Sequence, residues 1–163
     1  MTDEVRRRRR SFLGWMAGTA GLFTLSRTAR AQHAQGRDNA LFGEPKHKVV
    51  YQLNKANHQY VEDVLFSVGE LLRKYGDEIH IVVTAFGPGI QLLGKQPERP
   101  MPKVLRERAS SLAVYGVQFH ACHNTMKTLD WNKGDLVDYA IIVPIGADDI
   151  MRLQEKGYAY LSW

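Results

Sequence analysis

The sequence predicts an α/β fold with three layers, α/β/α, built on a mainly parallel five-stranded sheet. Short apolar runs alternate along the chain with stretches whose apolar residues recur at steps of three and four, the spacing of a helix that covers a sheet. Residues 79–86 are almost continuously apolar and β-branched, which is typical of a parallel strand buried on both faces. Strands that alternate with helices are joined by right-handed crossovers and form a parallel sheet.

The first strand is expected at residues 48–53, and a helix follows at about residues 59–75. Its apolar residues form one stripe: Val61, Val64, Leu65, Val68, Leu71, Leu72 and Tyr75. Gly76 is a natural end for this helix, since glycine tolerates the conformations found just past a helix C-terminus. After the strand at 79–86, the Gly/Pro-rich residues 87–102 predict a loop.

The second half of the chain continues the same alternation. The expected elements are a helix at about 103–115, a strand at 117–121 that ends at Cys122, a short helix from Asn124 or Thr125, a strand at 139–143, a helix at 147–156 and an edge strand at 158–161. Asn and Thr are good N-caps. Asp148 and Asp149 favour the first turn of the helix at 147–156, because carboxylates interact well with a helix N-terminus.

The first 31 residues predict an export signal. Residues 6–10 are all arginine, and an apolar stretch with several glycines covers residues 12–25. The stretch is too short for a comfortable membrane span, which needs about 20 apolar residues. Residues 29–31 read Ala-Arg-Ala, a small-x-small pattern that signal peptidase recognises, so we expect cleavage after Ala31.

Within this segment, Arg9, Arg10, Phe12 and Leu13 resemble a twin-arginine motif. We therefore expect export to the periplasm by the twin-arginine route, with contact to the membrane only during export. An ordinary Sec signal and a retained N-terminal anchor are the alternatives.

Two segments follow the signal. Residues 32–46 show no apolar period and predict a flexible tether, and residues 47–163 predict one domain. Of the 22 Lys and Arg residues, seven lie in residues 1–31, as do two of the 17 Asp and Glu, so 15 of each sign remain. The basic pI therefore belongs to the leader, and no nucleic-acid partner is expected.

Ligands of parallel α/β folds gather at the carboxyl ends of the strands. The candidate residues there are Asn54 and His58 after the first strand, Gly87 and Gly89 after the second, and His120, Cys122, His123 and Asn124 around the end of the third. The Gly87-Pro88-Gly89 segment could form a backbone nest for an anion, but a tight turn is the simpler interpretation, since it matches no nucleotide-binding motif.

Cys122 is the single cysteine, so neither an intrachain disulfide nor a dithiol cycle is available. Its place at a strand-to-helix turn favours the thiolate, as would a protonated His120 or His123. A lone cysteine at a strand end can equally be a small buried hydrophobe. A metal site of His120, Cys122 and His123 is a third interpretation, although metal sites usually need three or four protein ligands and only three are local.

Three segments of the chain resemble the DsrE/DsrF-like family: residues 116–126, which include Cys122 and Asn-Thr-Met, and residues 140–146 and 153–160. The resemblance implies a small parallel α/β/α domain that assembles with itself, often as a trimer or hexamer. It also implies that a cysteine carries sulfur as a persulfide between donor and acceptor proteins or small sulfur compounds, with no cofactor. By position that role falls on Cys122.

His120, His123 and Asn124 are neighbours that could tune this cysteine. The export signal argues against the cytoplasmic tRNA-thiolation role of some relatives. We therefore expect a periplasmic sulfur carrier more than a turnover enzyme. The alternative is an oligomeric binding module in which Cys122 is structural or ligates a metal with His120 and His123.

Overall fold

The computed structural model describes residues 44–163. The expected export signal, with its twin-arginine motif and its cleavage site after Ala31, lies outside these residues. Residues 32–43 of the expected tether lie outside them as well. Among the described helices, none is long and apolar enough to cross a membrane.

A five-stranded, all-parallel sheet forms the centre of the domain, with strand order β4-β3-β2-β1-β5. The strands are β1 (His47–Leu53), β2 (Ile79–Ala85), β3 (Gln118–Cys122), β4 (Ala140–Val143) and β5 (Ala159–Leu161). The predicted α/β class and parallel sheet are confirmed, and β5 lies at an edge as expected.

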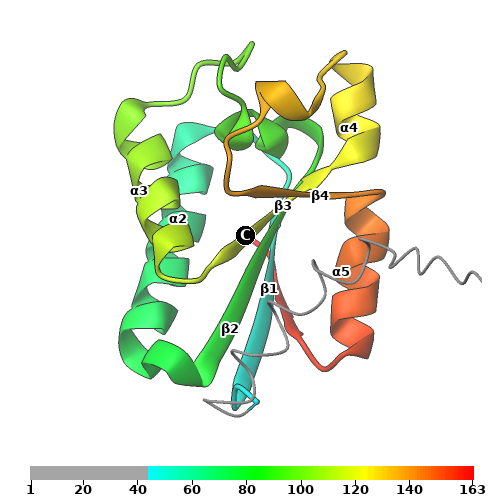
Figure 1. Ribbon diagram of the computed structural model, residues 1–163. Coiled ribbons are helices and arrows are strands. Elements are labelled where there is room, and N and C mark those ends of the chain that lie inside the picture. Colours follow the sequence, from blue (N-terminus) through cyan, green and yellow to red (C-terminus); the bar gives the residue numbers. More distant parts are fainter. Residues whose placement is uncertain (1–43) are drawn as a thin grey trace, which may run out of the picture.

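Helices cover both faces of the sheet, which gives the three predicted layers. The α-helices are α2 (His58–Tyr75), α3 (Lys103–Val114), α4 (His123–Thr128) and α5 (Gly146–Glu155). Short 3₁₀ helices are η2 (Gly76–Glu78), η3 (Gly87–Leu93) and η4 (Lys133–Asp135). In Figure 1, α2 and α3 lie together on one face of the sheet and α5 lies on the opposite face.

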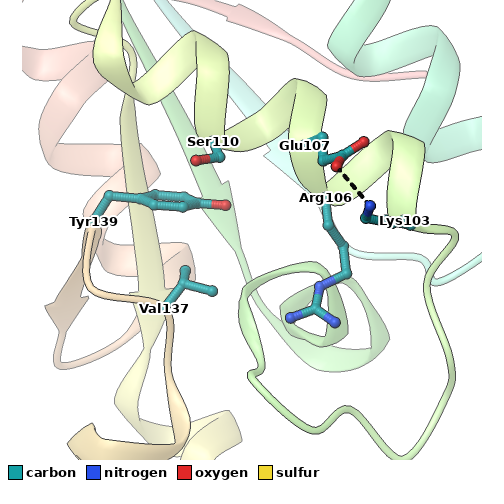
Figure 2. Close-up of a pocket in the computed structure, with 6 residues that line it drawn as sticks. All are labelled: Lys103, Arg106, Glu107, Ser110, Val137 and Tyr139. Atoms are coloured by element: carbon teal, nitrogen blue, oxygen red, sulfur yellow. Dashed lines mark ion pairs between the residues drawn. The ribbon is translucent and has the colours of Figure 1, made fainter.

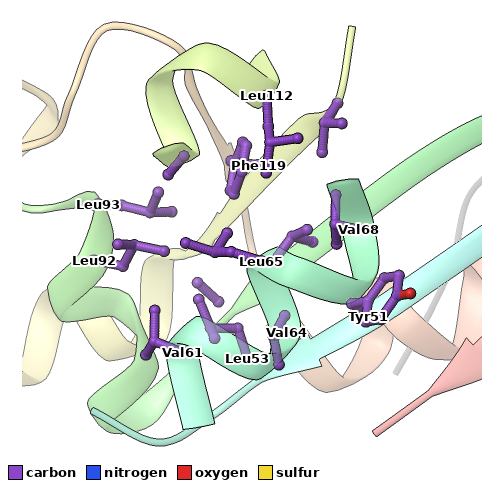
Figure 3. Packing of buried hydrophobic residues seen from close by; sticks show 14 of the residues in the cluster. Tyr51, Leu53, Val61, Val64, Leu65, Val68, Leu92, Leu93, Leu112 and Phe119 are labelled. Carbon is purple, nitrogen blue, oxygen red and sulfur yellow. The ribbon is translucent and has the colours of Figure 1, made fainter. Parts of the chain in front are cut away.

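The larger part of the core lies between the sheet and the α2–α3 layer. Figure 3 shows Leu53 of β1 and Phe119 of β3 packing with Val64 and Leu65 of α2, all four fully buried. A smaller cluster fills the α5 face: Val50, Val82, Ile150 and Leu153. Because β2 is buried on both faces, its near-continuous apolar pattern correctly predicted a central strand.

The predicted stripe of α2 faces the core, and the helix has clear ends. At its start, the side chain of Asn57 accepts a hydrogen bond from the N–H of Tyr60 (3.0 Å). At its end, Gly76 has φ 53°, in the left-handed region that glycine adopts without strain. The interpretation of Gly76 as a helix end is confirmed.

The prediction of a plain loop over residues 87–102 was wrong for its first half, because η3 begins at Gly87 and is buried from Gly89 to Leu93. Its apolar side chains, Leu92 and Leu93 among them, join the core above α2 (Figure 3). Gly89 passes so close to β1 that a Cβ there would lie 2.1 Å from the carbonyl oxygen of Leu53. The glycine therefore allows close packing of two backbones.

The short fourth helix also begins earlier than expected. It starts at His123, with Cys122 as its N-cap residue, instead of being capped by Asn124 or Thr125. Cys122 thus belongs at once to the last position of β3 and to the beginning of α4. This places its side chain at the carboxyl edge of the sheet.

Candidate functional site

Cys122 lies at the carboxyl end of β3 between two neighbours, β2 and β4, and pairs in register with Val143. Its Sγ accepts a hydrogen bond from the backbone N–H of Gly146, the first residue of α5, with an N–S distance of 3.2 Å. The residue is 5 % exposed, while His123, Asn124 and Ile145 around it are exposed. The sulfur therefore lies just below the surface.

The surroundings of the sulfur favour its ionised form. Burial raises the pKa of the Cys122 thiol, but the hydroxyl of Thr125 and the N–H groups of Thr125, Gly146 and Asn124 lower it, and the lowering dominates. Of these groups, Gly146 N–H has full hydrogen-bond geometry to Sγ, and the others act as dipoles near it. The sequence-based expectation named the following helix and a protonated His120 or His123. Asn124 and Thr125 do belong to that helix, but the hydrogen-bonded donor Gly146 comes from α5 and neither histidine is among the groups that lower the pKa.

Thr125 has a second role, because its Oγ1 accepts a hydrogen bond from the N–H of Gly87 (3.0 Å). Gly87 has φ 50° and starts the turn that leads from β2 into η3. This contact joins the ends of β2 and β3 beside the sulfur. Gly87 thus supports the site through Thr125, and the Gly87-Pro88-Gly89 segment forms the first turn of η3.

His120 shares with Cys122 the face of the sheet that α5 covers, since the two residues are two apart on β3. Its Nδ1 lies 2.8 Å from Oδ2 of Asp149, and its Nε2 lies 3.3 Å from Oε1 of Gln118. An ionised carboxylate only accepts hydrogen bonds, so Nδ1 carries the proton in this pair. Both ring nitrogens are therefore occupied by partners other than the sulfur.

Asp149 is held from two strands, because Thr84 of β2 also donates its hydroxyl proton to Oδ2 (2.8 Å). Burial raises the pKa of Asp149, but the hydrogen bond and charge of His120, the hydrogen bond of Thr84 and the charge of Lys156 lower it, and the net direction is down. Asp149 lies in the first turn of α5, where its backbone N–H donates to the carbonyl oxygen of Ile145 (2.9 Å). It fixes that turn, and hence Gly146, against the sheet.

The candidates after β1 lie apart from the sulfur, since β2 separates β1 from β3. The Oδ1 of Asn54 accepts a hydrogen bond from the hydroxyl of Tyr60 (3.2 Å), and the backbone N–H of Asn54 donates to the hydroxyl oxygen of Tyr60 (3.3 Å). His58 Nε2 lies 3.1 Å from the carbonyl oxygen of Pro100. The structure therefore places both residues in the turns around the start of α2.

His123 and Asn124 form the exposed first turn of α4, and the N–H of Asn124 also bonds the carbonyl of Pro144 (3.3 Å). Across residues 44–163, no three His, Cys, Asp or Glu side chains gather closely enough to hold a metal ion. His120 in particular is directed to Asp149, whereas the metal interpretation joined it to Cys122 and His123.

Sequence reasoning missed four residues that support the site: Thr84, Thr125 and Gly146 as partners of the sulfur, and Asp149. Asp149 was noted only for its place in a helix first turn. A signal for Thr84 was present, because a hydroxyl inside an apolar strand that is buried on both faces needs a hydrogen-bond partner. The identity of that partner depends on how α5 lies on the sheet.

The sequence and the fold were compared with those of known proteins. No curated protein matches the chain significantly. Among solved structures, the chain is similar to MTH1491, a protein of unknown function from Methanobacterium thermoautotrophicum, with 26% sequence identity and a TM-score of 0.64. The match covers 72% of this chain and 99% of that one. The model of the DsrE/DsrF-like family matches residues 22–163, and the chain therefore belongs to the DsrE/DsrF-like family.

Proposed function

We propose that this protein is a sulfur carrier in which Cys122 takes up sulfane sulfur as a persulfide and passes it to an acceptor. Membership of the DsrE/DsrF-like family supports sulfur relay or transfer in general. The observation that carries the assignment to Cys122 is the hydrogen bond from Gly146 N–H to its Sγ, at the N-terminus of α5. A group that donates to sulfur there stabilises the thiolate that attacks a sulfur donor.

The transfer is a displacement at sulfur. The Cys122 thiolate attacks the outer sulfur of a donor R–S–SH and forms a new S–S bond to it. The bond between the two donor sulfurs breaks, and R–S⁻ leaves with its electron pair. Cys122 then carries S–SH. In the second step an acceptor thiolate attacks the outer sulfur in the same way and releases the Cys122 thiolate, so no oxidant or reductant is consumed.

The surroundings of the sulfur suit a carrier more than a turnover enzyme. Turnover enzymes with a cysteine nucleophile commonly pair it with a histidine base. Here Asp149 and Gln118 occupy both ring nitrogens of His120, so this histidine is not directed to the thiol. The thiolate is instead favoured by fixed donors, Gly146 N–H among them.

An intact-mass measurement tests the proposal. The full chain is incubated with thiosulfate or polysulfide, and the mass is recorded before and after treatment with a reducing thiol. We expect a gain of one sulfur atom that the reductant removes and that Cys122→Ser abolishes. No adduct with any donor, together with an ordinary thiol pKa, would show that Cys122 is a structural residue and would overturn the carrier role.

The binding-module alternative makes a different prediction. If Cys122 ligated a metal with His120 and His123, protein purified without chelator would hold stoichiometric metal, and His123→Ala would lose it. The contact of His120 with Asp149 argues for the carrier, since it directs the imidazole away from a shared metal position.

We further propose that the carrier acts in the periplasm as a homo-oligomer. The export proposal is supported by the sequence of residues 1–31 alone. It is tested by fractionation of cells that express the full chain. The double variant Arg9→Lys, Arg10→Lys should remain in the cytoplasm, whereas the matched control Arg6→Lys, Arg7→Lys should be exported; equal export of both would contradict the twin-arginine route.

A further inference from the structure

A second feature lies away from Cys122, between α3 and the segment that enters β4. It is a hollow of about 320 Å³, here named the α3–β4 hollow. Its lining residues are Lys103, Arg106, Glu107 and Ser110 of α3, with Val137 and Tyr139 before β4. Figure 2 shows that the hydroxyl of Tyr139 points toward α3, with Ser110 and the guanidinium of Arg106 around the same space.

Arg106 brings a positive charge that no carboxylate of the described chain neutralises. Its one hydrogen bond within residues 44–163 runs from Nη2 to the carbonyl oxygen of Lys95 (3.3 Å). The guanidinium has five N–H donors, so most of them remain for another partner. By contrast, Lys103 and Glu107 are paired with each other across one turn of α3, with an N–O distance of 3.3 Å.

Tyr139 brings a fixed donor to the same space. Its ring meets the fully buried Phe119 edge-on, with 5.5 Å between the ring centroids and a 67° angle between the planes. Burial raises the pKa of Tyr139 to about 12, and the charge of Arg106 offsets part of that effect, so the phenol keeps its proton. Within residues 44–163 its hydroxyl makes no hydrogen bond, whereas a half-buried tyrosine hydroxyl usually has a partner.

From these groups we propose that the α3–β4 hollow binds a small organic monocarboxylate. Arg106 offers the planar fork that fits a carboxylate, and the hydroxyls of Tyr139 and Ser110 can donate to the same oxygens. Val137 and the face of Tyr139 form an apolar wall for the rest of the ligand. The lining carries one net positive charge, and the carboxylate of Glu107 disfavours a dianion such as phosphate.

The hollow is independent of the proposed sulfur chemistry. Phe119, which supports Tyr139, faces the α2–α3 layer, whereas Cys122 contacts the N-terminus of α5 on the other face. The occupancy of the hollow can therefore be measured without any sulfur donor, and Cys122→Ser should leave it unchanged.

The test is a titration of the isotope-labelled full chain with sodium benzoate, followed by the backbone amide signals in NMR. We expect saturable shifts confined to residues 103–110 and 136–140. Benzamide, which has the same shape without the charge, and inorganic phosphate, which has a higher charge, are the two comparison ligands. Both should bind at least about tenfold more weakly than benzoate. Benzamide lacks the negative charge that pairs with Arg106, and the carboxylate of Glu107 disfavours the dianionic charge of phosphate.

Two variants and one control identify the site. Tyr139→Phe keeps the ring against Phe119 and removes only the hydroxyl, and Arg106→Gln removes the charge; each should weaken benzoate about tenfold or more. Arg108→Gln removes a charge from the same helix, where Arg108 pairs with Glu62 at 3.9 Å outside the hollow, and should bind normally. Because Tyr139→Phe changes one hydroxyl only, it remains informative if Arg106→Gln fails to fold.

Three outcomes would overturn the proposal. Benzamide that binds as well as benzoate would make the hollow a merely apolar surface. Phosphate that binds more tightly than benzoate would make it a site for dianions. Benzoate shifts that do not saturate, or that persist in both Tyr139→Phe and Arg106→Gln, would remove the site altogether.

Discussion

Nδ1 of His120 lies 2.8 Å from Oδ2 of Asp149, and this contact joins the third strand of the sheet to the first turn of α5. The same turn begins with Gly146, whose N–H donates to the sulfur of Cys122. The position of a donor at the sulfur therefore depends on a largely buried His–Asp hydrogen bond three residues further along the helix. The first two predictions concern that pair.

Asp149→Ala should destabilise the protein by about 2–4 kcal/mol, because it leaves two largely buried donors, Nδ1–H of His120 and the hydroxyl of Thr84, without an acceptor. Asp148→Ala is the matched control. Asp148 lies in the same helical turn but forms an exposed pair with Arg152 (2.6 Å), so its loss should cost at most about 0.5 kcal/mol. Urea unfolding measures both; equal losses would show that the pair adds nothing beyond the helix dipole.

Acid should remove the contribution of Asp149. Its pKa in the folded protein lies below the ordinary value, because His120 and Thr84 outweigh the effect of burial. The stabilisation is therefore fully present above the unfolded pKa of about 3.9 and is lost as the pH falls through the folded pKa. The difference in unfolding free energy between wild type and Asp149→Ala should shrink as the pH is lowered from about 5. A difference that stays constant would exclude a titrating pair.

Thr125→Val should raise the pKa of the Cys122 thiol, since it removes the hydroxyl that lies near the sulfur and favours the thiolate. Thr125→Ser keeps the hydroxyl and is the matched control, so its thiol pKa should stay near that of the wild type. The thiolate absorbance in the ultraviolet, followed against pH, gives each pKa, and unfolded protein supplies the reference. The wild-type pKa should lie below that reference, and a wild-type value above it would show that burial dominates.

The parts of this molecule that the sequence predicts best are those with a local signal. The β-branched run of β2 and the apolar stripe of α2 are determined by their own residues, and together they define the parallel sheet and its carboxyl edge. The position of Cys122 at this edge was predicted in the same way, because a strand end followed by a helix is a local pattern. Its donor from α5 was not found, because Gly146 lies 24 residues away in sequence.

The His120–Asp149 contact was missed for the same reason, since its two residues are 29 apart and meet only because α5 packs on the sheet at one rotation. The 3₁₀ helix η3 was missed because Gly and Pro usually indicate a loop and a short 3₁₀ helix has no strong periodic signal. The apolar residues Ile90, Leu92 and Leu93 pack in the core and bury this helix.

The close approach of η3 to β1 leads to the last prediction. Gly89→Ala should destabilise the protein by about 1–3 kcal/mol or more, because the new methyl group would lie 2.1 Å from the carbonyl oxygen of Leu53 and the backbone would have to move.

Gly69→Ala is the opposite case within the same domain. It lies inside α2 with no atom within 4 Å of the added methyl group, so it should stabilise the helix by up to about 1 kcal/mol. Thermal unfolding of the two variants, recorded side by side, should move in opposite directions. A Gly89→Ala variant as stable as the wild type would mean that η3 is free to shift away from β1. In that case Gly87, and with it the N–H that it donates to Thr125 beside the sulfur, would not be held in place by the core.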